Sequence, residues 1–280
     1  MSKGLLDPKV DFVFKNIFGS PNHPEILISF LNATLKAKKK IVNVDIKKTD
    51  IEKQYIEDKY SRLDVKATTS NDEIINIEIQ LKNENNMVKR SLYYLSKMYE
   101  EQLNEKEDYS KLVRTVCINI LNFKYLKTDN FHTGYRFKEI ESNEELTDIM
   151  EVHFIEIPKL QDSSDEKDML VAWTEFLKDP ESEKVRGLEL SIEEIRQAKD
   201  ELIRMSNDST QRELYDMRAN SLRDKMSELN AAERKGIEKG REEGRKEEKI
   251  KIARNMKFKR VLSWKNYSIF VAEKTGRRDS

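Results

Sequence analysis

The sequence has few of the residues that crosslink chains, hold soft metals or cross membranes. Its 280 residues include one cysteine, Cys117, which excludes an internal disulfide and a cysteine-based zinc site. The three histidines, His23, His132 and His153, are too scattered to form a zinc cage by local spacing. No run approaches the roughly 20 apolar residues of a membrane span, and the N-terminus lacks an apolar signal segment. We therefore expect a cytoplasmic protein that does not enter a membrane.

Charge is abundant but balanced over the whole chain. The 52 lysines and arginines offset 52 aspartates and glutamates, which gives a formal net charge of zero. Charged residues make up 37% of the chain, above the roughly 25% that is usual in globular domains. The balance is uneven, because residues 251–280 carry nine basic and two acidic side chains (+7), which leaves residues 1–250 at −7. A basic end of this kind can hold phosphate without sequence preference.

Composition divides the chain into three parts. We expect a globular core over residues 1–180, a helical extension over 181–255, and a basic tail over 256–280 that has the irregular pattern of a degenerate or disordered end. Within the extension, residues 209–255 predict one long polar helix in which Gly236, Gly240 and Gly244 recur every four residues. A solvated helix or a weak coiled coil fits this pattern, so the extension is a candidate for homo-oligomer formation.

Hydrophobic periodicity predicts a mixed α/β fold, in which a central mixed β-sheet is flanked by helices. In the helix over residues 86–103, Val88, Leu92, Leu95 and Tyr99 form the expected core stripe, and Tyr94 is expected on the surface. The other expected helices span residues 10–18, 26–35, 166–178 and 189–205, and the expected strands span 41–47, 61–69, 73–81, 112–121, 134–140 and 150–158.

The strands over residues 61–69 and 73–81 form the most informative feature. Alternating apolar residues on both sides of a polar turn predict a β-hairpin. A symmetric turn centred on Asn71 pairs residues whose numbers add up to 142, so Asp64 lies opposite Glu78, with Gln80 on the same face. Opposed Cβ atoms lie about 4.5–5.5 Å apart. Two carboxylates at that distance repel each other unless a hard cation such as Mg²⁺ binds between them.

An ordinary explanation also exists for the opposed acids. Acidic pairs occur on solvent-exposed sheet faces without any metal, because solvent limits the repulsion. The register is itself an assumption, since a slip of one residue would put Asp64 and Glu78 on opposite faces.

Several segments in the same order resemble the Rpn family of recombination-promoting nucleases, also described as putative transposases, within the PD-(D/E)XK nuclease superfamily. They are LLDPKVDFVFKNIFG, ILISFLNATL, SRLDVKAT, IINIEIQL and KRSLYYLSKMYEEQL, and the resemblance extends over about residues 4–250. It implies a mixed sheet flanked by helices, a Mg²⁺ or similar divalent cofactor, and DNA as the partner. It also implies that Asp64 and Glu78 are the motif acids and that Gln80 stands at the usual lysine position, where its amide can orient water but carries no charge.

The resemblance implies further site residues. Asp11 is a candidate third metal ligand, although an acid in a first helical turn also suits the helix dipole. Arg62, Lys66 and Arg90 are candidates for contacts to the phosphate backbone. Tyr94, four residues after Arg90, is a candidate for shaping the site, and an arginine packed over a surface tyrosine is the alternative.

Two hypotheses about function follow. The first is a metal-dependent DNA endonuclease that promotes recombination by making breaks. The second is a catalytically weak DNA-binding or assembly module of a mobile-element protein, because Gln80 replaces a lysine and the long polar helix suits self-association. A transposase of the RNase-H type is disfavoured, since it needs three acids on a different strand order.

Overall fold

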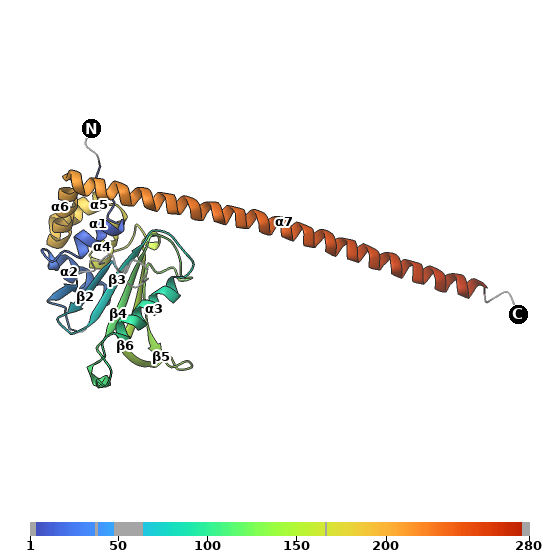
Figure 1. The fold of residues 1–280 in the computed structure, drawn as a ribbon, viewed down its shortest axis with the longest axis horizontal. Coiled ribbons are helices and arrows are strands. Elements are labelled where there is room, and N and C mark those ends of the chain that lie inside the picture. The colour runs from blue at the N-terminus through green and yellow to red at the C-terminus, as the bar shows by residue number, and fades with distance from the viewer. Residues whose placement is uncertain (1–3, 37–38, 48–63, 166, 276–280) are drawn as a thin grey trace. The chain divides into compact units, whose positions relative to one another are not determined.

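The computed structural model describes residues 4–36, 39–47, 64–165 and 167–275 (Figure 1). The chain divides into two compact units, Met1–Asn220 and Ser221–Ser280, which are described separately. Arg62 lies outside the described residues.

The first unit is built on a six-stranded mixed sheet with the strand order β1-β2-β3-β4-β6-β5. Strands β3, β4 and β6 are mutually parallel, whereas β1, β2 and β5 join them through antiparallel pairings. The strands are β1 (Val44–Lys47), β2 (Val65–Thr69), β3 (Ile74–Gln80), β4 (Thr115–Leu121), β5 (His132–Lys138) and β6 (Glu145–Glu156). This sheet with its flanking helices confirms the predicted fold class.

Helices cover both faces of the sheet. Val65 and Ile77 are paired and lie on one face of the sheet, and Val65 Cγ2 lies close to Gly19, which ends α1. On the opposite face, Met87 and Leu95 of α3 pack in one cluster with Cys117 and other buried residues of β4 and β6. The helices are α1 (Asp11–Phe18), α2 (Pro24–Leu35), α3 (Met87–Glu100), α4 (Met169–Lys178), α5 (Glu183–Ser191), α6 (Glu193–Asn207) and α7 (Ser209–Thr275), with short 3-10 turns η3 (Tyr109–Lys111) and η4 (Ile157–Lys159).

The hairpin of β2 and β3 has the predicted register. Val65 pairs with Ile77 and Ala67 with Ile75, so the numbers of paired residues add up to 142. Asp72 adopts a positive φ of 61° in the turn, a conformation that aspartate tolerates better than most residues. Ser70, Asn71 and Asp72 therefore close the hairpin as the sequence predicted.

Helix α3 buries a different face from the predicted one. Tyr94 is buried, whereas Val88 and Leu92 are 41% and 49% exposed, so the expected core stripe was wrong at these positions. Leu95 is buried as predicted. The side of α3 that meets the sheet is lined by Met87, Ser91, Tyr94, Leu95 and Met98. The buried face is therefore rotated around the helix axis relative to the stripe predicted from the sequence.

The C-terminal helices also differ from the predicted spans. The single helix expected over residues 189–205 is two helices, α5 and α6, which are separated at the extended residue Ile192. Ser182 caps α5 by accepting a hydrogen bond from Val185 N–H. Helix α7 begins at the predicted Ser209 but continues to Thr275, so the described part of the basic tail is helical.

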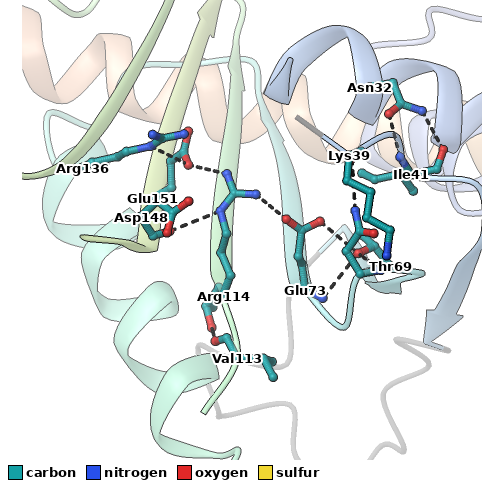
Figure 2. Close-up of polar contacts among 12 residues, drawn as sticks. Asn32, Lys39, Ile41, Thr69, Glu73, Val113, Arg114, Arg136, Asp148 and Glu151 are labelled. Carbon is teal, nitrogen blue, oxygen red and sulfur yellow. Dashed lines mark hydrogen bonds and ion pairs between the residues drawn. The ribbon is translucent and has the colours of Figure 1, made fainter. Parts of the chain in front are cut away.

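A charged network joins the strands at the start of β4 (Figure 2). The Arg114 guanidinium forms ion pairs with both Glu73 and Glu151, and its Nε donates to the Asp148 carbonyl at 3.2 Å. Arg136 Nε lies 3.0 Å from Glu151 Oε2. Burial opposes the ionisation of Glu151, but the hydrogen bonds from His153 and Arg114 outweigh burial and lower the pKa of Glu151 to about 2. Removing one partner of such a buried set typically costs about 3–5 kcal/mol.

His153 lies on the same side of the sheet as Glu151, and both of its ring nitrogens have hydrogen-bond partners. Its Nε2 lies 2.7 Å from Glu151 Oε1, and its Nδ1 lies 2.9 Å from Nε2 of His132. Gly134 pairs with His153 across the strands, and a Cβ at Gly134 would lie 3.1 Å from the imidazole Cε1. The glycine therefore gives the buried ring its space.

Candidate active site

Asp64 lies directly before β2, at the end of the sheet where the hairpin opens. Its Oδ2 accepts a hydrogen bond of 2.8 Å from the backbone N–H of Ile79 on β3. This bond ties Asp64 to the residue next to Glu78. Burial raises the pKa of Asp64 to about 7, and the Ile79 N–H opposes that rise only in part.

Glu78 lies in the middle of β3 on the side that faces α3. Its side chain is fully buried, and neither carboxylate oxygen accepts a hydrogen bond from the described residues. Burial raises the pKa of Glu78 to about 8, and the negative charge of Asp64 adds to the rise. A buried carboxylate without hydrogen bonds is unusual, so this position calls for a compensating positive charge.

Arg90 of α3 supplies part of that charge. Its Nε lies 3.3 Å from Glu78 Oε2, which makes an ion pair without hydrogen-bond geometry. The guanidinium carbon also lies 5.4 Å from the centre of the Tyr94 ring, a cation–π contact. Arg90 and Tyr94 are thus neighbours on α3, as their spacing of four predicted, and Arg90 connects Tyr94 to Glu78.

Gln80 and Lys66 are the remaining hairpin candidates that the structure describes. Gln80 ends β3, is partly exposed, and stands two residues from Glu78 on the same face. Lys66 of β2 forms an ion pair of 3.6 Å with Glu101, just after α3. Arg62 falls on residues that the structure does not describe, so its expected phosphate contact stays a prediction.

The first helix brings two charges toward Asp64. The charges of Asp11 and Lys15, one turn apart on α1, both act on Asp64: Asp11 raises its pKa and Lys15 lowers it. Asp11 also lies 3.6 Å from Arg218 NH1, at the start of α7. Arg218 could not be predicted as a partner of Asp11, because a contact between distant parts of the chain has no local pattern.

A hard divalent cation is chemically compatible with these donors. The fit rests on Glu78, whose two buried oxygens lack hydrogen bonds, and on its neighbour Asp64. Among the residues that the structure describes, no three His, Cys, Asp or Glu side chains gather as ligands, so Asp11 as a third ligand stays a prediction. Mg²⁺ usually takes one or two carboxylates and completes its shell with water and phosphate oxygens, so two acids suffice.

Comparison with known proteins gives one match. The profile of a family described as PD-(D/E)XK nuclease family transposase matches residues 8–232 of the chain. This range contains the whole sheet, all the acids discussed above and the first part of α7. No curated protein and no solved structure gives a significant match. Within the described ranges, none of the helices has the length and apolarity of a membrane span.

Proposed function

Because this chain belongs to the PD-(D/E)XK nuclease family transposases, we propose that it is a divalent-cation-dependent DNA endonuclease whose breaks promote recombination. Family membership itself implies DNA cleavage by a mobile-element protein. One observation carries the finer proposal: Glu78 is a buried carboxylate without hydrogen bonds from the described residues, and it stands beside the second acid, Asp64.

Each acid has a defined task in this proposal. Asp64 and Glu78 hold the cation. The Ile79 N–H donates a hydrogen bond to the Asp64 carboxylate and so fixes its orientation toward the cation. A bound Mg²⁺ would make a coordinated water more acidic and offset charge on the phosphate. The Gln80 amide, at the partly exposed end of β3, orients the attacking water by hydrogen bonding.

Basic side chains around the acids position the DNA backbone. Arg90, Lys66 and Arg62 are the proposed phosphate contacts. The Tyr94 ring holds the Arg90 guanidinium through a cation–π contact. Contacts of this kind fix where the duplex lies but do not read its sequence. We therefore expect cleavage with little sequence preference and with strong dependence on salt.

A plasmid-nicking assay tests the proposal. Purified full-length protein should convert supercoiled DNA to the open circle in Mg²⁺ and not in EDTA. Asp64→Asn and Glu78→Gln should each reduce the nicking rate at least about 100-fold, since the cation would lose a charged ligand. Glu141→Gln, at an exposed glutamate in the β5–β6 loop, is the matched control and should cut at the rate of the wild type. Equal rates in all four proteins would refute the assignment.

A second function is favoured by Gln80. Because Gln80 supplies no positive charge at the position where the resemblance implies a lysine, the chain is alternatively a catalytically weak DNA-binding or assembly module. Titration calorimetry separates the two proposals: Mg²⁺ binding that is lost in Glu78→Gln supports the endonuclease. DNA binding without detectable Mg²⁺ binding supports the module.

We also propose that α7 mediates self-association. The described side chains from residue 236 to residue 249 are exposed all round the helix, and a long helix that is polar on every side gains little stability by itself. Sedimentation of the full chain should give a mass above 33.1 kDa that falls to the monomer value when Ile237, 51% exposed, is changed to aspartate. A monomeric wild type would refute this proposal.

A further inference from the structure

The basic side chains around Asp64 differ in whether an acid already neutralises them. Arg90 lies 3.3 Å from Glu78 Oε2, and Lys66 lies 3.6 Å from Glu101 Oε2. A cation that is paired in this way offers less attraction to an incoming phosphate, because its partner's charge partly cancels its field. Neither Arg90 nor Lys66 is therefore a fully available positive charge.

Lys15 on α1 is different. It is half-buried, and its side chain makes no hydrogen bond or ion pair with any residue that the structure describes. The acid best placed to pair with it on the same helix is Asp11, four residues earlier, but Asp11 contacts Arg218 at 3.6 Å. The ammonium group of Lys15 therefore keeps its charge available within this part of the molecule.

The position of α1 brings Lys15 near the start of β2, where Asp64 lies. The helix ends against the start of β2, because a Cβ at Gly19 would lie 3.4 Å from Val65 Cγ2, and Val65 directly follows Asp64. Lys15 is one turn before that contact, since its carbonyl accepts the Gly19 N–H at 2.9 Å. Lys15 therefore lies on the part of α1 that approaches the start of β2, within electrostatic range of the Asp64 carboxylate.

The proposed hydrolysis needs such a charge. A water oxygen forms a bond to phosphorus and its proton passes to solvent. The bond from phosphorus to the leaving oxygen breaks, and that oxygen keeps the electron pair and takes up a proton from solvent. Negative charge grows on the non-bridging oxygens during this step, and a preorganised cation stabilises it. Gln80 carries no charge with which to do so. We infer that Lys15 contacts the scissile phosphate and supplies from α1 the positive charge that position 80 lacks, a role that rests on the nuclease function proposed above.

Single-turnover cleavage separates this role from a structural one. Lys15→Gln removes the charge, shortens the side chain by one atom and keeps a good helix former. Lys138→Gln, at an exposed lysine of the edge strand β5, is the matched control. We expect Lys15→Gln to lower the maximal cleavage rate roughly 100-fold and to raise half-saturating DNA by no more than about 10-fold, as for one lost phosphate contact, with an unchanged melting temperature. Adding Gln80→Lys to Lys15→Gln should recover at least about a tenth of the wild-type rate, because the charge returns. Wild-type rate in Lys15→Gln would overturn the inference.

A binding measurement keeps the test decisive if the wild type does not cut DNA. In EDTA, the slope of log affinity for a duplex against log salt should be smaller by about 0.9 in Lys15→Gln than in the wild type, as for one lost phosphate contact. Lys138→Gln should leave the slope unchanged. An inactive wild type with a reduced slope would remove the nuclease proposal and leave the phosphate contact supported. An inactive wild type with an unchanged slope would overturn both.

Discussion

The buried carboxylate of Glu78 should make the stability of this protein fall as the pH rises. The folded protein raises the pKa of Glu78 from 4.5 to about 8, chiefly because burial disfavours the charged form. The folded chain therefore holds this proton more tightly than the unfolded chain does. The resulting stabilisation is complete below pH 4.5 and is lost progressively as the pH rises through about 8.

The size of the effect follows from the two pKa values. The interval from 4.5 to about 8, at about 1.4 kcal/mol per pH unit, corresponds to roughly 5 kcal/mol. Glutamine has nearly the same shape and no titrating proton. Glu78→Gln should therefore gain about 3–5 kcal/mol of unfolding free energy relative to the wild type between pH 5 and pH 9.

Urea unfolding in EDTA at pH 5, 7 and 9 measures this difference. EDTA removes divalent cations, which would otherwise bind the ionised acids and stabilise the folded state. The control is Glu141→Gln, at an exposed position, whose unfolding free energy should follow that of the wild type at every pH. If the curves of Glu78→Gln and the wild type run parallel from pH 5 to pH 9, burial does not govern the ionisation of Glu78, and the reasoning fails.

Two further predictions test the packing of the β5–β6 pair and of α3. Gly134→Ala should destabilise the protein by about 1–3 kcal/mol, because the new methyl group would lie 3.1 Å from the ring of His153; Gly187→Ala, in open space on α5, should instead add about 0.5–1 kcal/mol. Thermal denaturation of both variants checks this, and equal shifts would contradict the close approach. Leu95→Ala should cost about 2–5 kcal/mol, whereas Leu92→Ala, at a side chain that is 49% exposed, should cost less than about 0.5 kcal/mol. Urea unfolding compares the two, and a larger cost at Leu92 would contradict the buried face of α3.

The sequence predicted the sheet and the hairpin register because both depend on local signals. Alternation of isoleucines along residues 75–79 fixes which side of β3 is apolar, and the polar turn centred on Asn71 fixes the pairing. The strand β4 was predictable for a similar reason, since seven consecutive buried residues give an almost unbroken apolar run.

Features that depend on distant contacts were not predictable. Helix α3 carries apolar residues on two sides, so periodicity could not decide whether Leu92 or Tyr94 meets the sheet. The pairing of Asp11 with Arg218 joins opposite ends of the first unit and leaves no trace in local spacing. The start of α5 had a detectable signal, because Ser182 followed by an acid is a common start of a helix.

In strand β3, substitutions that unfold the protein and substitutions that remove its candidate acid occur side by side, so both can cause the same loss of function. Ile77 and its neighbours anchor the strand in the apolar layer, and the next residue along is Glu78. Under the proposed nuclease function, a selection for cells that escape DNA damage will therefore collect replacements of the isoleucines together with replacements of Glu78. Only the amount of intact protein in each mutant strain will distinguish the loss of an active-site acid from the loss of the fold.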